Sequence, residues 1–210
     1  MNEIKNILIG AACLLVFEAS GQDKEKFDGK KWEAPYTLEI PKSWDVERFL
    51  IPIAFASTIP YNGIEDIRFT PGWGKKETNE YWTYAFLWFL DGRPKFNSKI
   101  IEKNLKAYYT GLTNINIDKK QIDTTKLTQV TVSIQKRSSY QGDLKTFEGT
   151  VSMIDYMTRK PIIVNLIVHI KFCEGQNKTF VFHEISPKPY TDLIWDDLNR
   201  LWANFKCTKE

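Results

Sequence analysis

Residues that commonly carry chemistry are scarce in this chain, which has two histidines and three cysteines among 210 residues. A zinc site needs three or four ligands, so His169 and His183 alone do not make one. The glycines of Gly72-Trp73-Gly74 lack the lysine and the spacing of a phosphate-binding loop. No serine lies in a G-x-S-x-G elbow, and we therefore predict no metal, no cofactor and no catalytic residue.

An excess of charge of one sign is also missing. The chain has 29 Lys and Arg against 26 Asp and Glu, which gives a formal net charge of +3. The basic residues are scattered in short pairs such as Lys30-Lys31 and Lys75-Lys76. Nucleic-acid-binding proteins concentrate positive charge in a patch or stripe, so the sequence predicts no nucleic-acid partner.

No apolar run is long enough to cross a membrane, which takes roughly 20 residues. The run from Ile7 to Phe17 is shorter, follows Lys5 in a polar head and precedes the small residues Ala19-Ser20-Gly21. That layout is typical of a secretory signal peptide. We predict that residues 1–21 are removed before Gln22, and that the protein is secreted or periplasmic.

The three cysteines divide into one in the signal and a later pair. Cys13 follows Gly10-Ala11-Ala12, which faintly resembles a lipoprotein box, but Gly10 stands where leucine is usual and the apolar run continues past Cys13. We therefore do not expect lipid anchoring through Cys13. Cys173 and Cys207 remain as an even pair in an oxidising compartment, which favours a disulfide over two independent thiols.

Hydrophobic patterns after the charged lead at residues 22–31 predict one domain from 32 to 210. Short turns between the predicted strands indicate antiparallel pairing in a sheet of about six strands. Trp32–Ile40 also alternates and is expected to form a peripheral strand, whereas Asp45–Thr58 is ambiguous because Pro52 interrupts it. The six predicted strands are Ile64–Thr70, Glu80–Leu90, Thr128–Lys136, Lys145–Tyr156, Pro161–Cys173 and Lys178–Ser186.

Two segments have the apolar period of a helix. The first is Ser98–Thr110, with Ser98 as its cap and Gly111 as its stop. The second follows Thr191 or Asp192 near the C-terminus. The apolar stripes are Ile101, Leu105, Tyr108 and Leu112 in the first helix and Ile194, Leu198, Leu201 and Phe205 in the second. One helix after the second predicted strand and one at the C-terminus, both packed on the sheet, define an α+β fold.

This order of elements resembles the PsbP/Mog1 group over about Glu80 to Cys207. The most similar part is a strand at Lys178–Ser186, a proline-containing break, and a helix that carries Trp195 and closes at Asn204-Phe205-Lys206-Cys207. The resemblance implies an antiparallel sheet with helices on both faces, and it implies no activity. The chain is also similar to secreted bacterial proteins to which no activity is assigned.

Polar rows on the later strands are the one candidate site. They form either a concave binding surface or the solvent side of the sheet. We predict a non-catalytic binding or interaction module with an unknown ligand or protein partner; the alternative is a secreted hydrolase with His169 or His183 as its base. We expect neither histidine to lie in a cleft beside an acid. The candidate ligand-binding residues are Gln129, Thr131, Thr150, Ser152, Asn165 and His169.

Overall fold

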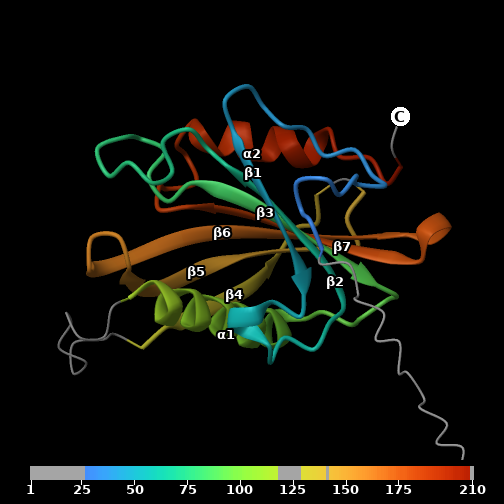
Figure 1. Cartoon of the computed structure of the whole chain (residues 1–210), viewed down its shortest axis with the longest axis horizontal. Helices are drawn as coiled ribbons and strands as arrows, with labels where there is room; N and C mark the ends of the chain where they lie inside the picture. Colours follow the sequence, from blue (N-terminus) through green and yellow to red (C-terminus); the bar gives the residue numbers. More distant parts are fainter. Residues whose placement is uncertain (1–26, 118–128, 141, 209–210) are drawn as a thin grey trace, which may run out of the picture.

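One antiparallel sheet of seven strands organises the molecule, with the strand order β1-β2-β3-β7-β6-β5-β4. The computed structural model describes residues 27–117, 129–140 and 142–208. Helices α1 (Ser98–Asn116) and α2 (Ile194–Ala203) lie on opposite sides of the sheet (Figure 1). The strands are β1 (Asp45–Ile51), β2 (Gly63–Phe69), β3 (Tyr84–Asp91), β4 (Thr131–Arg137), β5 (Lys145–Asp155), β6 (Lys160–Cys173) and β7 (Lys178–Ser186).

The α+β class is confirmed, with one strand more than predicted. The additional strand is β1, which ends at Ile51, directly before the proline that made this stretch ambiguous. The first helix therefore follows the third strand. The predicted signal peptide at 1–21, including Cys13, lies outside the described residues, as does Thr128, the predicted start of the strand found as β4.

The prediction of a strand at Trp32–Ile40 is wrong. In this stretch Thr37 forms an isolated bridge with Lys206, and the segment runs over the face of the sheet that carries α2. Tyr36 and Leu38 are buried there against Phe89 and other side chains of the α2 face. Apolar residues alternate in this segment because every second side chain packs onto the sheet below it. A segment that covers a sheet shows this pattern as well as a strand that belongs to one.

Helix α1 differs from its prediction at both ends. Its cap is Asn97, whose side chain accepts a hydrogen bond of 2.9 Å from the amide of Ile100, and not Ser98. The helix also continues through Gly111, which is therefore not its stop. A Cβ atom at Gly111 would lie 1.9 Å from the carbonyl oxygen of Phe55 in the short 3-10 helix η1 (Ala54–Ala56). Glycine is needed here so that η1 can pack closely against α1.

One helix is too narrow to cover a whole face of this sheet. Seven strands spaced by about 4.8 Å measure roughly 29 Å across, whereas a helix with its side chains is about 10 Å wide. Helix α1 packs mainly against β4, β5 and η1, and its Tyr108 ring also stacks on Phe86 of β3. The α1-side face of β1 and β2 is thus left to η1 and to aromatic side chains.

On the α2 face the predicted disulfide is confirmed. Cys173 at the end of β6 and Cys207 after α2 are bonded, with 5.9 Å between their Cα atoms. The apolar stripe of α2 is buried as predicted, together with Trp195 and Trp202. Within the described residues, neither helix has the length and apolar character needed to cross a membrane.

Candidate ligand-binding site

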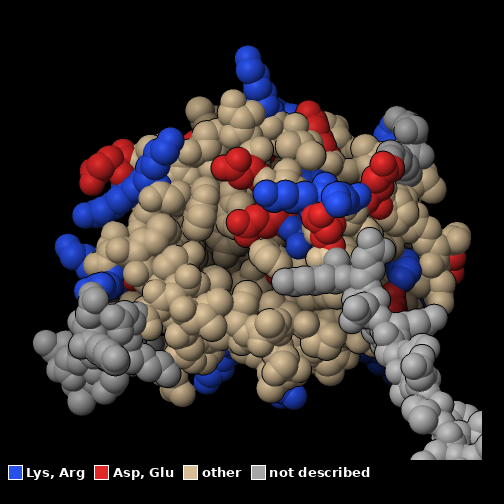
Figure 2. Space-filling view, viewed as in Figure 1, with Lys and Arg blue, Asp and Glu red and all other residues tan. Residues whose placement is uncertain are grey.

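The incompletely covered part of the α1 face contains a cavity of about 760 Å³. Strands β1 and β2, the η1 segment and helix α1 all contribute to its walls. Figure 2 shows a hollow near the middle of this view, with charged side chains above it and an uncharged surface below it. The lining is mainly apolar and aromatic, and includes Ile67, Phe69, Trp73, Trp82, Leu112 and Tyr156.

Large apolar side chains also reach solvent along this cavity. Phe49, Leu50 and Ile115 all line it, and they are 41%, 51% and 63% exposed. Phe49 and Leu50 belong to the edge strand β1, while Ile115 lies in the last turn of α1. Clustered apolar exposure of this kind is typical of an opening that accepts an apolar partner or ligand.

Glu65 is the buried carboxyl group of this cavity wall. In β2 it lies between Phe49 of β1 and Trp88 of β3 in the strand register. The indole Nε1 of Trp88 donates to Glu65 Oε1 at 3.2 Å, whereas Oε2 has no hydrogen-bond partner. Burial raises the pKa of Glu65 to about 7, although the Trp88 indole and the nearby Tyr108 hydroxyl act in the opposite direction.

Basic groups do not compensate this carboxyl. No ion pair to Glu65 occurs among the described residues, and none of the described lysines lines the cavity. Glu47, from the same side of β1, adds a second acid to the lining, and burial raises its pKa. Arg48 also borders the cavity, but its guanidinium Nε donates to Asp66 at 2.9 Å. The site therefore combines an apolar lining with uncompensated acidic character.

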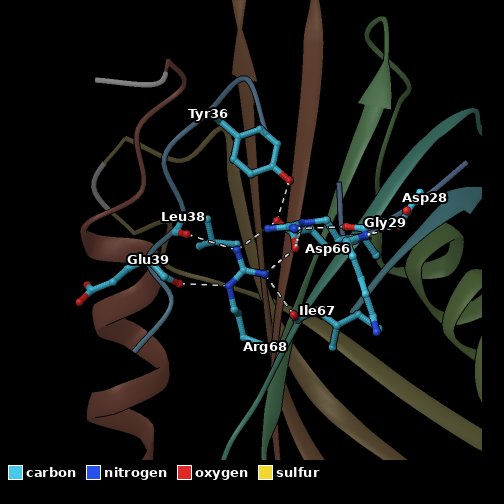
Figure 3. Close-up of polar contacts among 10 residues, drawn as sticks. Asp28, Gly29, Tyr36, Leu38, Glu39, Asp66, Ile67 and Arg68 are labelled. Carbon is cyan, nitrogen blue, oxygen red and sulfur yellow. Dashed lines mark hydrogen bonds and ion pairs between the residues drawn. The ribbon is translucent and has the colours of Figure 1, made fainter. Parts of the chain in front are cut away.

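The opposite side of β2 carries a fully paired carboxylate, Asp66 (Figure 3). The Tyr36 hydroxyl donates to Asp66 Oδ2 at 3.0 Å, and Arg48 Nε donates to Oδ1. Arg68 donates to both oxygens, from Nη1 to Oδ1 and from Nη2 to Oδ2. Asp66 is fully buried and yet both of its oxygens are satisfied.

Arg68 in turn fastens the N-terminal segment to the sheet. Besides Asp66, its guanidinium reaches the backbone oxygens of Glu39 at 3.1 Å, Leu38 at 3.2 Å and Ile67 at 3.1 Å (Figure 3). Together these bonds use the five N–H donors that a guanidinium has. Arg68 is therefore a structural link, with no donor left for a ligand.

Comparison with known proteins adds no relative to this geometry. No family model matches the chain, and no curated protein or solved structure matches it. The resemblance to the PsbP/Mog1 group therefore stays a prediction, and the functional argument depends on the site itself.

The structure places the two histidines on opposite faces of the sheet. His169 is paired with Phe182 and shares its face, whereas His183 is the next residue of β7 and points to the other face. His183 faces α1, where its ring stacks on Phe86 with 4.1 Å between the centroids. Burial lowers the pKa of His183 to about 3, so this ring is neutral at physiological pH.

His169 is packed in the interior and does not lie in a cleft, but it has two acidic neighbours that the sequence pattern did not indicate. Its Nδ1 is 2.7 Å from Asp143 Oδ2, and its Nε2 is 3.3 Å from Glu184 Oε1. Burial acts to lower the pKa of His169, but the two carboxylates outweigh burial and raise it. Trp202 from α2 covers the cluster and donates to Asp143 Oδ1 at 2.8 Å. Because His169 is only 2% exposed, the group is closed to substrate.

The polar rows predicted as a site do align across three strands on the α2-side face. Thr131 is paired with Ser152, and Thr150 with Asn165. Thr131 is exposed, Asn165 donates to the Lys188 carbonyl at 2.9 Å, and Gln129 is exposed just before β4. None of the six candidates is among the residues that line the cavity.

Sequence reasoning missed Glu65 although a signal was present. In the stretch Ile64–Thr70, Glu65 shares a face with Ile67 and Phe69, so one acid interrupts an otherwise apolar row. Asp66 and Arg68 carry charges on the other row, so this strand has buried charge on both faces. Only the neighbouring strands show which of these charges is paired.

Proposed function

We propose that this protein is a secreted or periplasmic binding module that holds an apolar small molecule in the cavity beside β1, β2, η1 and α1. The observation that carries the proposal is the cavity itself, whose aromatic lining continues to the exposed side chains Phe49, Leu50 and Ile115. Its volume of about 760 Å³ lies within the range of about 300–1,000 Å³ for small-molecule sites.

Export is the second part of the proposal. The disulfide between Cys173 and Cys207 supports it, because such bonds persist in oxidising compartments. The layout of residues 1–21 is the other support. Mass spectrometry of the exported protein should find Gln22 at its start; a retained Met1, or a lipid on Cys13, would contradict this.

Ligand binding is tested with decan-1-ol, a neutral apolar probe, followed by the fluorescence of Trp73 and Trp82 in the cavity wall. We expect saturable binding of one molecule per chain. Ala54→Trp introduces a large ring at an exposed lining position of η1 and should weaken binding at least about tenfold. Ala203→Trp, at an exposed position of α2 on the other side of the sheet, is the matched control and should bind as the unchanged protein does. Equal weakening by both variants, or no saturable binding, would refute the proposal.

The alternative proposal, a hydrolase with His169 or His183 as base, has little support in the geometry. A general base needs a free ring nitrogen within reach of the group that it deprotonates. Both nitrogens of His169 face carboxylates, and His183 is packed against Phe86 and Trp88. Replacing either histidine by glutamine should leave decan-1-ol affinity unchanged.

A further inference from the structure

The acidic character of the cavity narrows the chemistry of its ligand. We propose that the ligand is an apolar molecule that ends in an amine, and that its ammonium group pairs with Glu65 while its hydrocarbon part fills the aromatic lining. This inference rests on the proposed binding function. An alkylammonium ion is the simplest molecule of this class.

The first argument is the missing countercharge at Glu65. The side chain is fully buried, its Oε1 has one donor in Trp88, and its Oε2 has no partner. An unpaired buried carboxylate is costly, whereas an ammonium group supplies both the opposite charge and up to three N–H donors. Because Glu65 lies in the cavity wall, a partner approaches it from the cavity side.

The second argument is that the other charges at the cavity also favour a cation. Glu47 is an acid in the lining and lies on the same side of β1 as Phe49, the residue opposite Glu65. A carboxylate or phosphate head group would thus meet two acids, and Arg48, which also borders the cavity, is already held by Asp66 and the Gly29 carbonyl.

The pairing should make binding depend on pH through Glu65. The groups facing it are Phe49 and Glu47 of β1, Trp88 of β3 and the Tyr108 hydroxyl of α1. Burial raises the pKa of Tyr108 well above its usual value, so that hydroxyl stays neutral over the relevant range. His183, which touches Trp88, is uncharged there as well because its pKa is about 3.

A proton and an ammonium group therefore compete for the same carboxylate. Since an alkylamine is itself charged below about pH 10, its affinity should rise with pH as Glu65 ionises and level off above pH 7. The apparent affinity scales with the ionised fraction of the site, which gives at least about a tenfold gain between pH 5.5 and pH 8.

The experiment compares three probes that share one chain length: decylamine, decan-1-ol and decanoate. We expect decylamine to bind at least about tenfold more tightly than the other two at pH 8. Glu65→Gln should remove both this preference and the pH dependence, so that decylamine binds no more tightly than decan-1-ol to this variant. Glu47→Gln, which removes the other acid of the lining, should weaken decylamine binding only about two- to threefold because that charge is less buried.

A measurement on the unchanged protein keeps the inference testable even if a variant fails to fold. Calorimetry at pH 6 in buffers of different ionisation enthalpy should show that decylamine releases close to one proton and decan-1-ol none. Decylamine binding without proton release, or decanoate binding as tight as decylamine binding, would overturn the inference. If decan-1-ol binds but decylamine is not preferred, only the amine assignment fails; if none of the probes binds, the proposed function itself fails.

Discussion

Glu65 and Asp66 are consecutive residues of β2, and both side chains are fully buried, yet their surroundings differ sharply. Asp66, on the side of α2, accepts hydrogen bonds from Tyr36, Arg48 and Arg68 and has two arginines as counterions. Glu65, on the side of α1, has one donor to Oε1, none to Oε2 and no counterion among the described residues. Both the free energy of folding and the pH response should therefore differ between these neighbours.

The same contrast extends to the two faces of the sheet. The α2 face is closed by the N-terminal segment, the disulfide and α2, whose side chains form a continuous buried cluster. The α1 face has a single helix packed toward β4 and β5 and retains a cavity beside β1 and β2. Asp66 on the closed face has arginine counterions, whereas Glu65 on the open face has none among the described residues. We infer that the α2 face serves stability and that the α1 face serves binding.

The largest expected loss of stability follows from the replacement of Asp66, the carboxylate that is paired with arginines. Asp66→Ala leaves the buried guanidinium of Arg68 without its counterion, which should lower the free energy of unfolding by about 3–5 kcal/mol. Urea denaturation at pH 7 measures the change. Glu65→Gln is the matched variant at the next position, and it should not destabilise the protein at that pH. Similar losses in both variants would break the comparison.

Removing the disulfide should have an effect of similar size on the same face. The bond closes a loop with a sequence separation of 34 residues, so the double variant Cys173→Ser/Cys207→Ser should lose about 3–4 kcal/mol in the loop-entropy model. Denaturation of the variant beside the oxidised protein measures this. Decan-1-ol affinity of the folded fraction should not change, since the cavity lies on the other face; a large loss of affinity would contradict the separation of roles.

The free energy of unfolding should depend on pH through the unpaired carboxyl group of Glu65. Because burial raises the pKa of Glu65 to about 7, the unfolded chain loses this proton near pH 4.5 while the folded chain keeps it. This group therefore makes the folded state less stable as pH rises from about 4.5 to 7. Glu65→Gln lacks that loss, so its stability relative to the unchanged protein should rise by about 2–4 kcal/mol between pH 4.5 and pH 8. His169 and Glu184 titrate in both proteins, so their contributions cancel when the two free energies of unfolding are subtracted. If this difference does not change with pH, the pKa of Glu65 is not raised.

The smallest effect is expected on the polar strand face. Thr131 is exposed on the edge strand β4 and is not part of the cavity lining. Thr131→Ala should change the free energy of unfolding by less than about 0.5 kcal/mol and leave decan-1-ol affinity unchanged. A clear loss of affinity would move the site to this face, where the sequence first suggested it.

Several elements were predictable from the sequence because they depend on local patterns. The stripe of α2 and the alternation in β4 and β5 reflect the period of a helix and of a strand, which any stable packing has to satisfy. The pairing of Cys173 with Cys207 followed because no other cysteine remained after the predicted signal peptide. Local patterns did not show whether Trp32–Ile40 joins the sheet or covers it, because both arrangements bury alternate residues.

Tertiary structure alone decided which residues become neighbours across the sheet. The contact of β3 with β7 joins segments far apart in the chain, and together with the packing of α1 toward β4 and β5 it leaves the cavity beside β1 and β2. The role of Gly111, the acids around His169 and the unpaired state of Glu65 depend on that arrangement. The sequence thus determined both helices, six of the seven strands and the disulfide, because local periodicity and composition encode them. The site required the tertiary structure, because charge compensation and cavity shape depend on contacts that no local pattern records.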